Sequence, residues 1–179
     1  MKAILFASFI LFLCIPACDA QTRRAPLAER EQVHFSAEDE GVRRPAALPG
    51  DVLEVLGKQK RVVDILESQQ IPPEQLPLSW FSASIIHLGR SNDDDFIVEG
   101  EPPLSGANTV TFWVFRSTPN GHELVLTAAA HDLIVRKASW NGYRDLEMMA
   151  VTAMRVDRVL FRFDGKRYQQ YREKLEAIR

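Results

Sequence analysis

The residues that could do chemistry in this chain do not assemble into a recognised catalytic motif. His122 and Glu123 begin like a zinc-protease motif, but Leu126 stands where the second histidine ligand would follow one helical turn later. His131 and Asp132 are neighbours in a segment patterned as a strand. We therefore expect their side chains on opposite faces, where they cannot act as a base and its orienting carboxylate. The chain contains no Gly-x-Ser-x-Gly elbow either, so we predict no catalytic residues.

Paired carboxylates are the one catalytic arrangement that the pattern leaves open. Asp95 and Asp145 occupy comparable places in two hairpin-like stretches, and folding could bring them together as the acid and base of a hydrolase. A hydrolase of envelope polymers is therefore the alternative to a non-catalytic binding module.

Aromatic residues at one turn give the clearest sign of a recognition surface. Trp140, Asn141, Tyr143 and Arg144 are of the types that binding surfaces favour, and large rings at a turn need not be buried. We predict a binding site here for a protein or polymer. In the structural alternative, Trp140 folds back over the hairpin and Tyr143 pairs across the strands.

Two stretches of the chain share a pattern of a polar turn followed by a hairpin. The turns at residues 89–95 and 141–145 precede β-rich runs that end in Asn120-Gly121 and Asp164-Gly165. In this respect residues 84–168 resemble FG-GAP (integrin-type) β-propeller repeats. The resemblance implies antiparallel hairpins, and turns of that family often hold calcium.

A calcium site would use the oxygen-rich run Asn92, Asp93, Asp94 and Asp95, because hard cations take carboxylate ligands. The run lacks the alternating spacing of a calcium loop, and Phe96 stands where the sharp-turn glycine would be. A solvated hairpin turn is the alternative role, and we predict no other cofactor.

The N-terminus predicts export. Lys2 precedes the apolar run 3–15, and Pro16 and small residues up to Ala20 follow, which is the pattern of a secretion signal with cleavage after Ala20. Residues 15–18 also resemble a bacterial lipobox, in which Cys18 would be lipidated. We expect a secreted or periplasmic protein, with a lipid-anchored envelope protein as the alternative.

Composition excludes several classes of function. Both cysteines of the chain, Cys14 and Cys18, lie in the predicted leader, so disulfides, thiol catalysis and cysteine-bound metal are not expected in the mature protein. The net charge is −2, and no basic stripe is present to bind nucleic acid. Contact with a membrane is expected only through an N-terminal lipid.

The elements that must position these residues follow from periodicity. We predict a signal peptide over 1–20, a flexible linker over 21–49 and one mostly-β domain over 50–179. Apolar spacing indicates a helix over 51–69, or two shorter helices divided at Gly57. The same spacing indicates a short C-terminal helix from Tyr168. Seven strands are predicted at residues 80–88, 95–99, 109–116, 122–128, 132–137, 144–152 and 157–163.

The expected fold is mainly β (α+β): an antiparallel meander, sandwich or partial propeller-like sheet with an N-terminal and a C-terminal helix. The strand at 109–116 carries large apolar side chains on both faces, so we place it centrally and covered on both sides. The function predicted for this fold is an exported, non-catalytic binding module that recognises an envelope protein or polymer through hairpin loops. A structural lipoprotein is a further alternative.

Overall fold

The computed structural model of the chain describes residues 31–89 and 93–177. The predicted secretion signal over 1–20, the lipidation residue Cys18 and Asn92 of the predicted calcium site lie outside the described residues. Among the helices that are described, none is long and apolar enough to cross a membrane.

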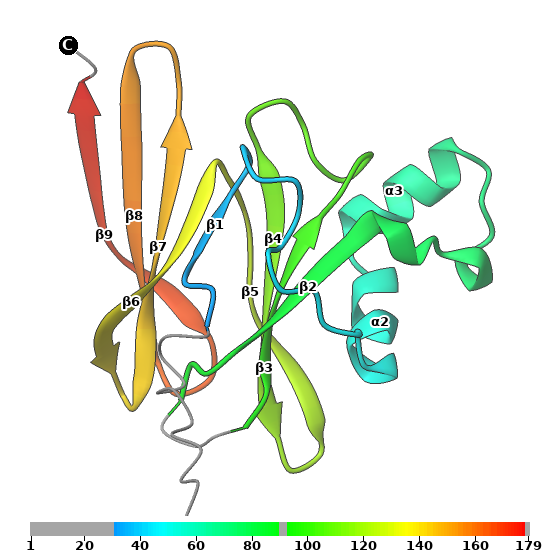
Figure 1. The fold of residues 1–179 in the computed structure, drawn as a ribbon, viewed down its shortest axis with the longest axis horizontal. Helices are drawn as coiled ribbons and strands as arrows, with labels where there is room; N and C mark the ends of the chain where they lie inside the picture. The colour runs from blue at the N-terminus through cyan, green and yellow to red at the C-terminus, as the bar shows by residue number, and fades with distance from the viewer. Residues whose placement is uncertain (1–30, 90–92, 178–179) are drawn as a thin grey trace, which may run out of the picture. The chain divides into compact units, whose positions relative to one another are not determined.

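The described chain is mostly β, as predicted, and its strands form two antiparallel sheets (Figure 1). The four-stranded sheet has the order β2-β3-β4-β5, and the five-stranded sheet has the order β1-β6-β7-β8-β9. The strands of the first sheet are β2 (Phe81–Ile86), β3 (Asp95–Gly100), β4 (Val110–Thr118) and β5 (Gly121–Ala130). Those of the second are β1 (His34–Ser36), β6 (Asp132–Trp140), β7 (Tyr143–Val151), β8 (Arg155–Phe163) and β9 (Tyr168–Ala177).

Two short helices precede the sheets. The helix expected over 51–69 is divided into α2 (Gly50–Gly57) and α3 (Lys60–Ser68), and two 3₁₀ turns follow at Pro73–Gln75 and Leu78–Trp80. The first helix ends at Gly57. Glycine has no side chain and loses more backbone entropy on folding than other residues, so it weakens the interior of a helix.

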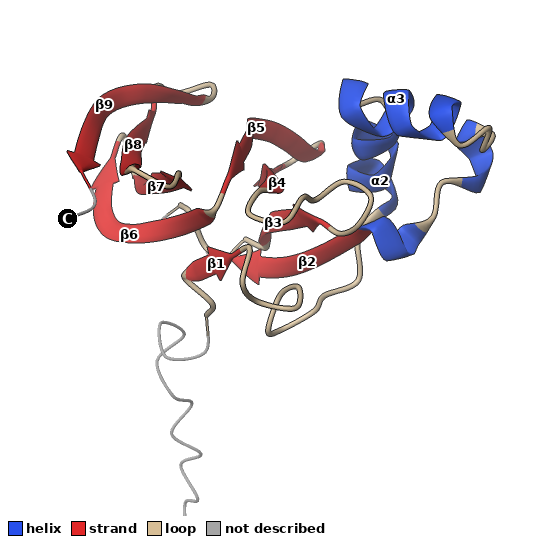
Figure 2. Ribbon diagram, turned by 90° about the horizontal axis from the view of Figure 1, so that it is seen from above, coloured by secondary structure: helices blue, strands red, loops and turns tan. Residues whose placement is uncertain are grey.

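The helices cover one face of the four-stranded sheet, and the five-stranded sheet shares a core with its other face (Figure 2). Strand β4 shows why both layers form, because it pairs with β3 and β5 and sends its side chains alternately to the two cores. Trp113 and Phe115 join the helix-side core, whereas Phe112 and Val114 join the core shared with the other sheet. The predicted central, doubly covered strand is confirmed.

The predicted C-terminal helix is wrong, since the segment forms strand β9. Gly165, at φ +106°, lets the chain turn tightly after β8, so Tyr168 pairs with Phe163 and the backbone groups of β8 gain a second partner strand. The helical spacing of Tyr168, Tyr171 and Leu175 does not reflect a buried face, because Tyr168 is buried while the other two are exposed.

The predicted linker over 21–49 is also wrong from Glu31 onward. Residues 34–36 form β1, which pairs with β6, and Phe35 is fully buried in the core between the sheets. Val42 is buried in the same core, and its backbone amide donates to the hydroxyl of Ser82. This polar segment has few apolar residues, but two of them, Phe35 and Val42, are buried in the core.

Candidate functional site

The outer face of the five-stranded sheet carries the candidate site. Strand β7 shows the alternation that builds it: Leu146 and Met148 point into the core, whereas Asp145 and Glu147 line a groove of about 350 Å³. The groove runs across β6 to β9, and none of its lining residues belongs to either core.

Cationic side chains predominate in this groove. Three carboxylates also line it, those of Asp145, Glu147 and Glu176. The cations are Arg136, Arg158, Arg162, Arg172 and Lys174. The lining therefore has a local charge of +2 (five cations against three carboxylates), although the net charge of the whole chain is −2.

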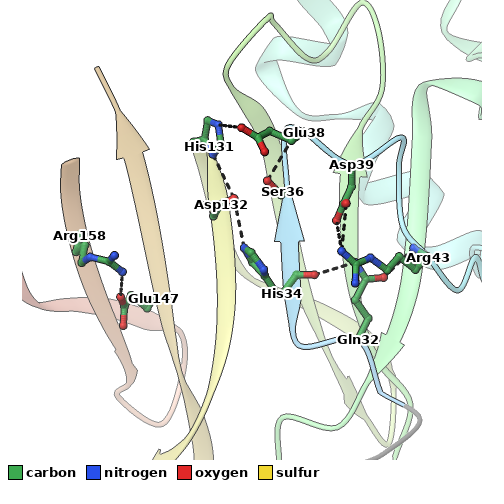
Figure 3. A network of polar contacts seen from close by, with 10 residues as sticks. All are labelled: Gln32, His34, Ser36, Glu38, Asp39, Arg43, His131, Asp132, Glu147 and Arg158. Atoms are coloured by element: carbon green, nitrogen blue, oxygen red, sulfur yellow. Dashed lines mark hydrogen bonds and ion pairs between the residues drawn. The ribbon is translucent and has the colours of Figure 1, made fainter. Parts of the chain in front are cut away.

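Ion pairs across the strands hold most of these cations in place. Figure 3 shows the contact between Glu147 on β7 and Arg158 on β8. The two side chains are 2.9 Å apart, and Glu147 also lies 3.3 Å from Arg136 on β6. On β9, Glu176 contacts Arg158 at 3.5 Å and Lys174 at 2.7 Å. The hydrogen bond to Glu147 raises the pKa of Arg158 above its usual value. The pairs thus fix the positions of charged groups that long side chains would otherwise leave mobile.

Arg172 differs from its neighbours, because it has no ion-pair partner among the described residues. Arg162, by contrast, contacts the buried Asp145 at 3.3 Å. An anionic ligand in the groove would therefore meet one arginine whose charge no carboxylate of the described chain offsets.

One end of the groove is formed by an arginine between two aromatic rings. The guanidinium of Arg162 lies 3.8 Å from the ring centre of Tyr171 and 5.0 Å from that of Trp140. The two aromatic residues are 53% and 51% exposed, which is unusual for rings of this size. We call Trp140, Arg162 and Tyr171 the aromatic-arginine platform. All three line a second pocket of about 290 Å³ that shares Arg162 with the groove.

The four residues predicted to bind are separated by the structure. Trp140 belongs to the platform, but Asn141 holds the turn, with φ +50° and its side-chain amide donating to the carbonyl of Phe163 at 3.0 Å. Tyr143 stacks on Phe163 with ring centres 4.2 Å apart. Arg144 is directed to Glu31, 2.6 Å away. The last three residues therefore support the hairpin. Of the structural alternative, the part in which Tyr143 pairs across the strands is confirmed, because Tyr143 lies opposite Trp140 in the register of β6 and β7. Trp140 itself is 51% exposed.

Sequence reasoning missed the other members of the site. Arg162 and Arg172 carry no motif, and Tyr171 was assigned to a helix face. The outward alternation of arginine in β8, visible at Arg158 and Arg162, was the available signal, but it becomes a groove only once β9 is a strand.

Three of the four predicted calcium residues, Asp93, Asp94 and Asp95, are described by the structure. Asp93 and Asp94 are exposed, whereas Asp95 is buried and accepts hydrogen bonds from the backbone amides of Leu88 and Ser117. Across residues 31–89 and 93–177 no group of three or more acidic, histidine or cysteine side chains is arranged to hold a metal ion.

The predicted carboxylate pair is divided between the sheets. Asp95 lies on β3 of the four-stranded sheet and bonds backbone amides, while Asp145 lies on β7 of the five-stranded sheet beside Arg162. Each carboxylate thus has its own structural partner.

The expectation for His131 and Asp132 is wrong. His131 occupies a bend between β5 and β6, so strand alternation does not apply, and its Nδ1 lies 3.2 Å from Asp132 Oδ1. His34 Nε2 approaches the same oxygen at 3.4 Å, and Glu38 lies 3.8 Å from His131 Nε2 (Figure 3). These contacts join β1 and the segment after it to the start of β6.

Comparisons of the chain with protein-family models, with curated proteins and with solved structures return no match. The resemblance of residues 84–168 to FG-GAP repeats therefore stays a prediction.

Proposed function

We propose that the protein is an exported, non-catalytic binding module that recognises an acidic envelope polymer on the outer face of its five-stranded sheet. The observation that carries this proposal is the exposed aromatic-arginine platform, which continues into a groove of net positive charge. This location replaces the hairpin loops as the expected binding surface, although Trp140 belongs to both.

The chemistry of the surface favours a ligand with both rings and carboxylates. Trp, Tyr and Arg are the residue types that contribute most to binding energy, and exposed rings offer flat apolar faces. Arg172 adds a guanidinium that can bond a carboxylate through two N–H groups. The neighbouring ion pairs order these side chains before a ligand binds. They therefore lower the conformational entropy that the side chains lose on binding.

Export forms part of the proposal and rests on residues 1–20 of the sequence. A secreted or periplasmic product meets envelope polymers directly. Lipidation at Cys18 would give the same domain a membrane anchor. The mass of the N-terminal peptide of the mature protein distinguishes cleavage after Ala20 from acylation at Cys18.

Fluorescence of Trp140 tests the binding site directly. Of the three tryptophans in the chain, Trp80 and Trp113 are buried and Trp140 is half exposed, so a ligand on the platform should change mainly its emission. We expect soluble peptidoglycan fragments, which combine sugar rings with carboxylates, to shift this emission saturably. Neutral chitin oligosaccharides, which have similar rings without the carboxylates, should bind more weakly.

Variants of the site provide the matched comparison. Arg172→Gln should weaken binding of the fragments about tenfold, the size of one contact worth about 1.4 kcal/mol. Arg155→Gln, at an exposed arginine on β8 that does not line the groove, should leave binding unchanged. Equal binding of the neutral oligosaccharides, or cleavage of the fragments by the purified protein, would contradict the proposal.

A further inference from the structure

A separate cavity of about 240 Å³ lies where β3 ends and the segment after β1 passes it. Three carboxylates line it, those of Asp39, Glu99 and Glu101. Most of the remaining wall is small or apolar, including Gly41, Gly106 and Val110. The cavity shares no residue with the groove or the platform, so it is a second, independent feature of the surface.

Glu99 is the unusual member of this set. Its side chain is 2% exposed, and no protein group in the described chain bonds its Oε1. Burial, with smaller contributions from Glu101 and Asp39, raises the pKa of Glu99 to about 8. Burial also raises the pKa of Glu101. A buried carboxyl without a donor is costly, and at a cavity wall an occupant with N–H groups can supply one.

The charged groups around the cavity leave this acceptor unopposed. On the segment after β1, Asp39 is bonded by Arg43, with both of its oxygens 3.2 Å from Nη2. On β3 and immediately after it, Glu99 and Glu101 face each other's charge. The wall formed by residues 102–110 contributes Pro102, Ser105, Gly106 and Val110, none of which is charged.

We propose that this acidic pocket binds an alkylammonium or alkylguanidinium group, the cationic end of a lysine or arginine side chain or of a free diamine. A bare metal ion is a poorer fit, because the three carboxylates are not arranged as a group that could hold one. The volume is several times the roughly 30 Å³ that one water molecule occupies, which suits an aliphatic stem as well as a charged head. In this arrangement the small residues of the pocket contact the aliphatic stem of the ligand, and the carboxylates of Glu99 and Glu101 bind its cationic head.

Proton release is the signature that separates this site from a passive cavity. Glu99 is largely protonated at pH 7, so a bound cation that stabilises its ionised form must displace its proton. Calorimetric titrations at pH 7 in buffers of different ionisation enthalpy measure the number of protons released. We expect Nα-acetyl-lysine methylamide to bind with release of close to one proton, and Nα-acetyl-norleucine methylamide, which has no ammonium group, not to bind.

Variants and competing ligands complete the test. Glu99→Gln keeps the shape of the protonated side chain, and it should abolish proton release and weaken binding about tenfold or more. Glu101→Gln should weaken binding with proton release retained, and Glu67→Gln, exposed on α3, should change neither. Binding of cadaverine in place of the capped lysine assigns the same site to free diamines. Stronger binding of Ca²⁺ than of either amine, or no binding of any probe, overturns the proposal.

Arg172→Gln should leave all these results unchanged, which keeps this test separate from that of the groove.

Discussion

Two buried carboxylates on the same strand differ in how their charge is accommodated. Asp95 Oδ2 accepts from the amide of Leu88 at 2.8 Å and Oδ1 accepts from that of Ser117 at 2.7 Å. Glu99 has an oxygen with no such donor. Burial raises the pKa of both residues, but at Asp95 the backbone amides oppose the rise. Asp95 therefore acts as a structural anchor, whereas Glu99 is held in a form suited to exchange a proton.

Replacement of Asp95 tests its structural role. Asp95→Asn would place an amide NH₂ opposite one of the two backbone donors and leave that buried N–H without an acceptor. We expect a loss of about 1–3 kcal/mol in the free energy of unfolding, measured by chemical denaturation. Asp93→Asn, at an exposed position, is the control and should be neutral. Unchanged stability with loss of a hydrolytic activity would instead favour the carboxylate-hydrolase alternative.

Glu99 should make the stability of the protein depend on pH. A carboxyl with a pKa of about 8 in the folded state and about 4.5 in the unfolded state binds more protons when folded, so its stabilising contribution is complete below 4.5 and is lost as the pH rises to 8. Unfolding at a series of pH values should show a decline on the order of a few kcal/mol across this window. Glu99→Gln should flatten the decline and be the more stable protein at pH 8. Persistence of the same slope in the variant would refute this assignment.

Single residues also show where strand rules stop. His131 was expected to point away from Asp132, which holds only within a strand, yet its backbone lies at the bend where the chain passes from one sheet to the other. No composition or spacing marks that bend. Conversely, Phe112 and Trp113 could be assigned to opposite faces from the sequence, because alternation continues through the interior of a long strand.

At the scale of elements, strands β2 to β8 were predictable, and the two edge strands of the five-stranded sheet, β1 and β9, were not. Strands β2 to β8 have β-rich runs bounded by turn residues, and each occurs close to its expected range. Strand β1 has three residues in a polar segment, too few for a period to be visible. Most side chains of strand β9 are exposed. Its sequence therefore lacks the alternation of apolar and polar residues that would have distinguished a strand from an amphipathic helix. Strand β1 pairs with β6, which is far from it in sequence. Strand β9 pairs with β8 through the turn at Gly165.

The short strand β1 should contribute to stability out of proportion to its length. Phe35 is fully buried between the sheets, so Phe35→Ala should lower the free energy of unfolding by about 3–5 kcal/mol, measured by denaturant titration. Val33→Ala, two residues earlier and partly exposed, is the matched control and should cost less than about 1 kcal/mol. Equal effects of the two changes would mean that the segment is the linker first expected.

At the scale of the whole molecule, opposite charges are concentrated in different places. The groove lining carries a charge of +2 and the acidic pocket is lined by carboxylates, although the chain as a whole is close to neutral. Composition could exclude a general polyanion binder, but it could not reveal either site, because both arise from residues of several strands that only the sheet brings together. The candidate site was therefore predictable only at Trp140.

This charge distribution predicts a shallow salt dependence for binding of peptidoglycan fragments. A near-neutral protein exerts no long-range attraction on an acidic polymer, so affinity must come from the platform and from about one or two local charge contacts. Between 0.05 and 0.5 M NaCl we expect the affinity, followed by Trp140 emission, to fall by a factor of roughly ten to one hundred. A protein that contacts six to ten phosphates loses affinity by a factor of roughly 10³–10⁵ over a narrower range of salt concentration.

Arg172→Gln should make the salt dependence shallower still, because it removes the one groove cation without a carboxylate partner in the described chain. A steep dependence that Arg172→Gln does not alter would place the ligand on another surface.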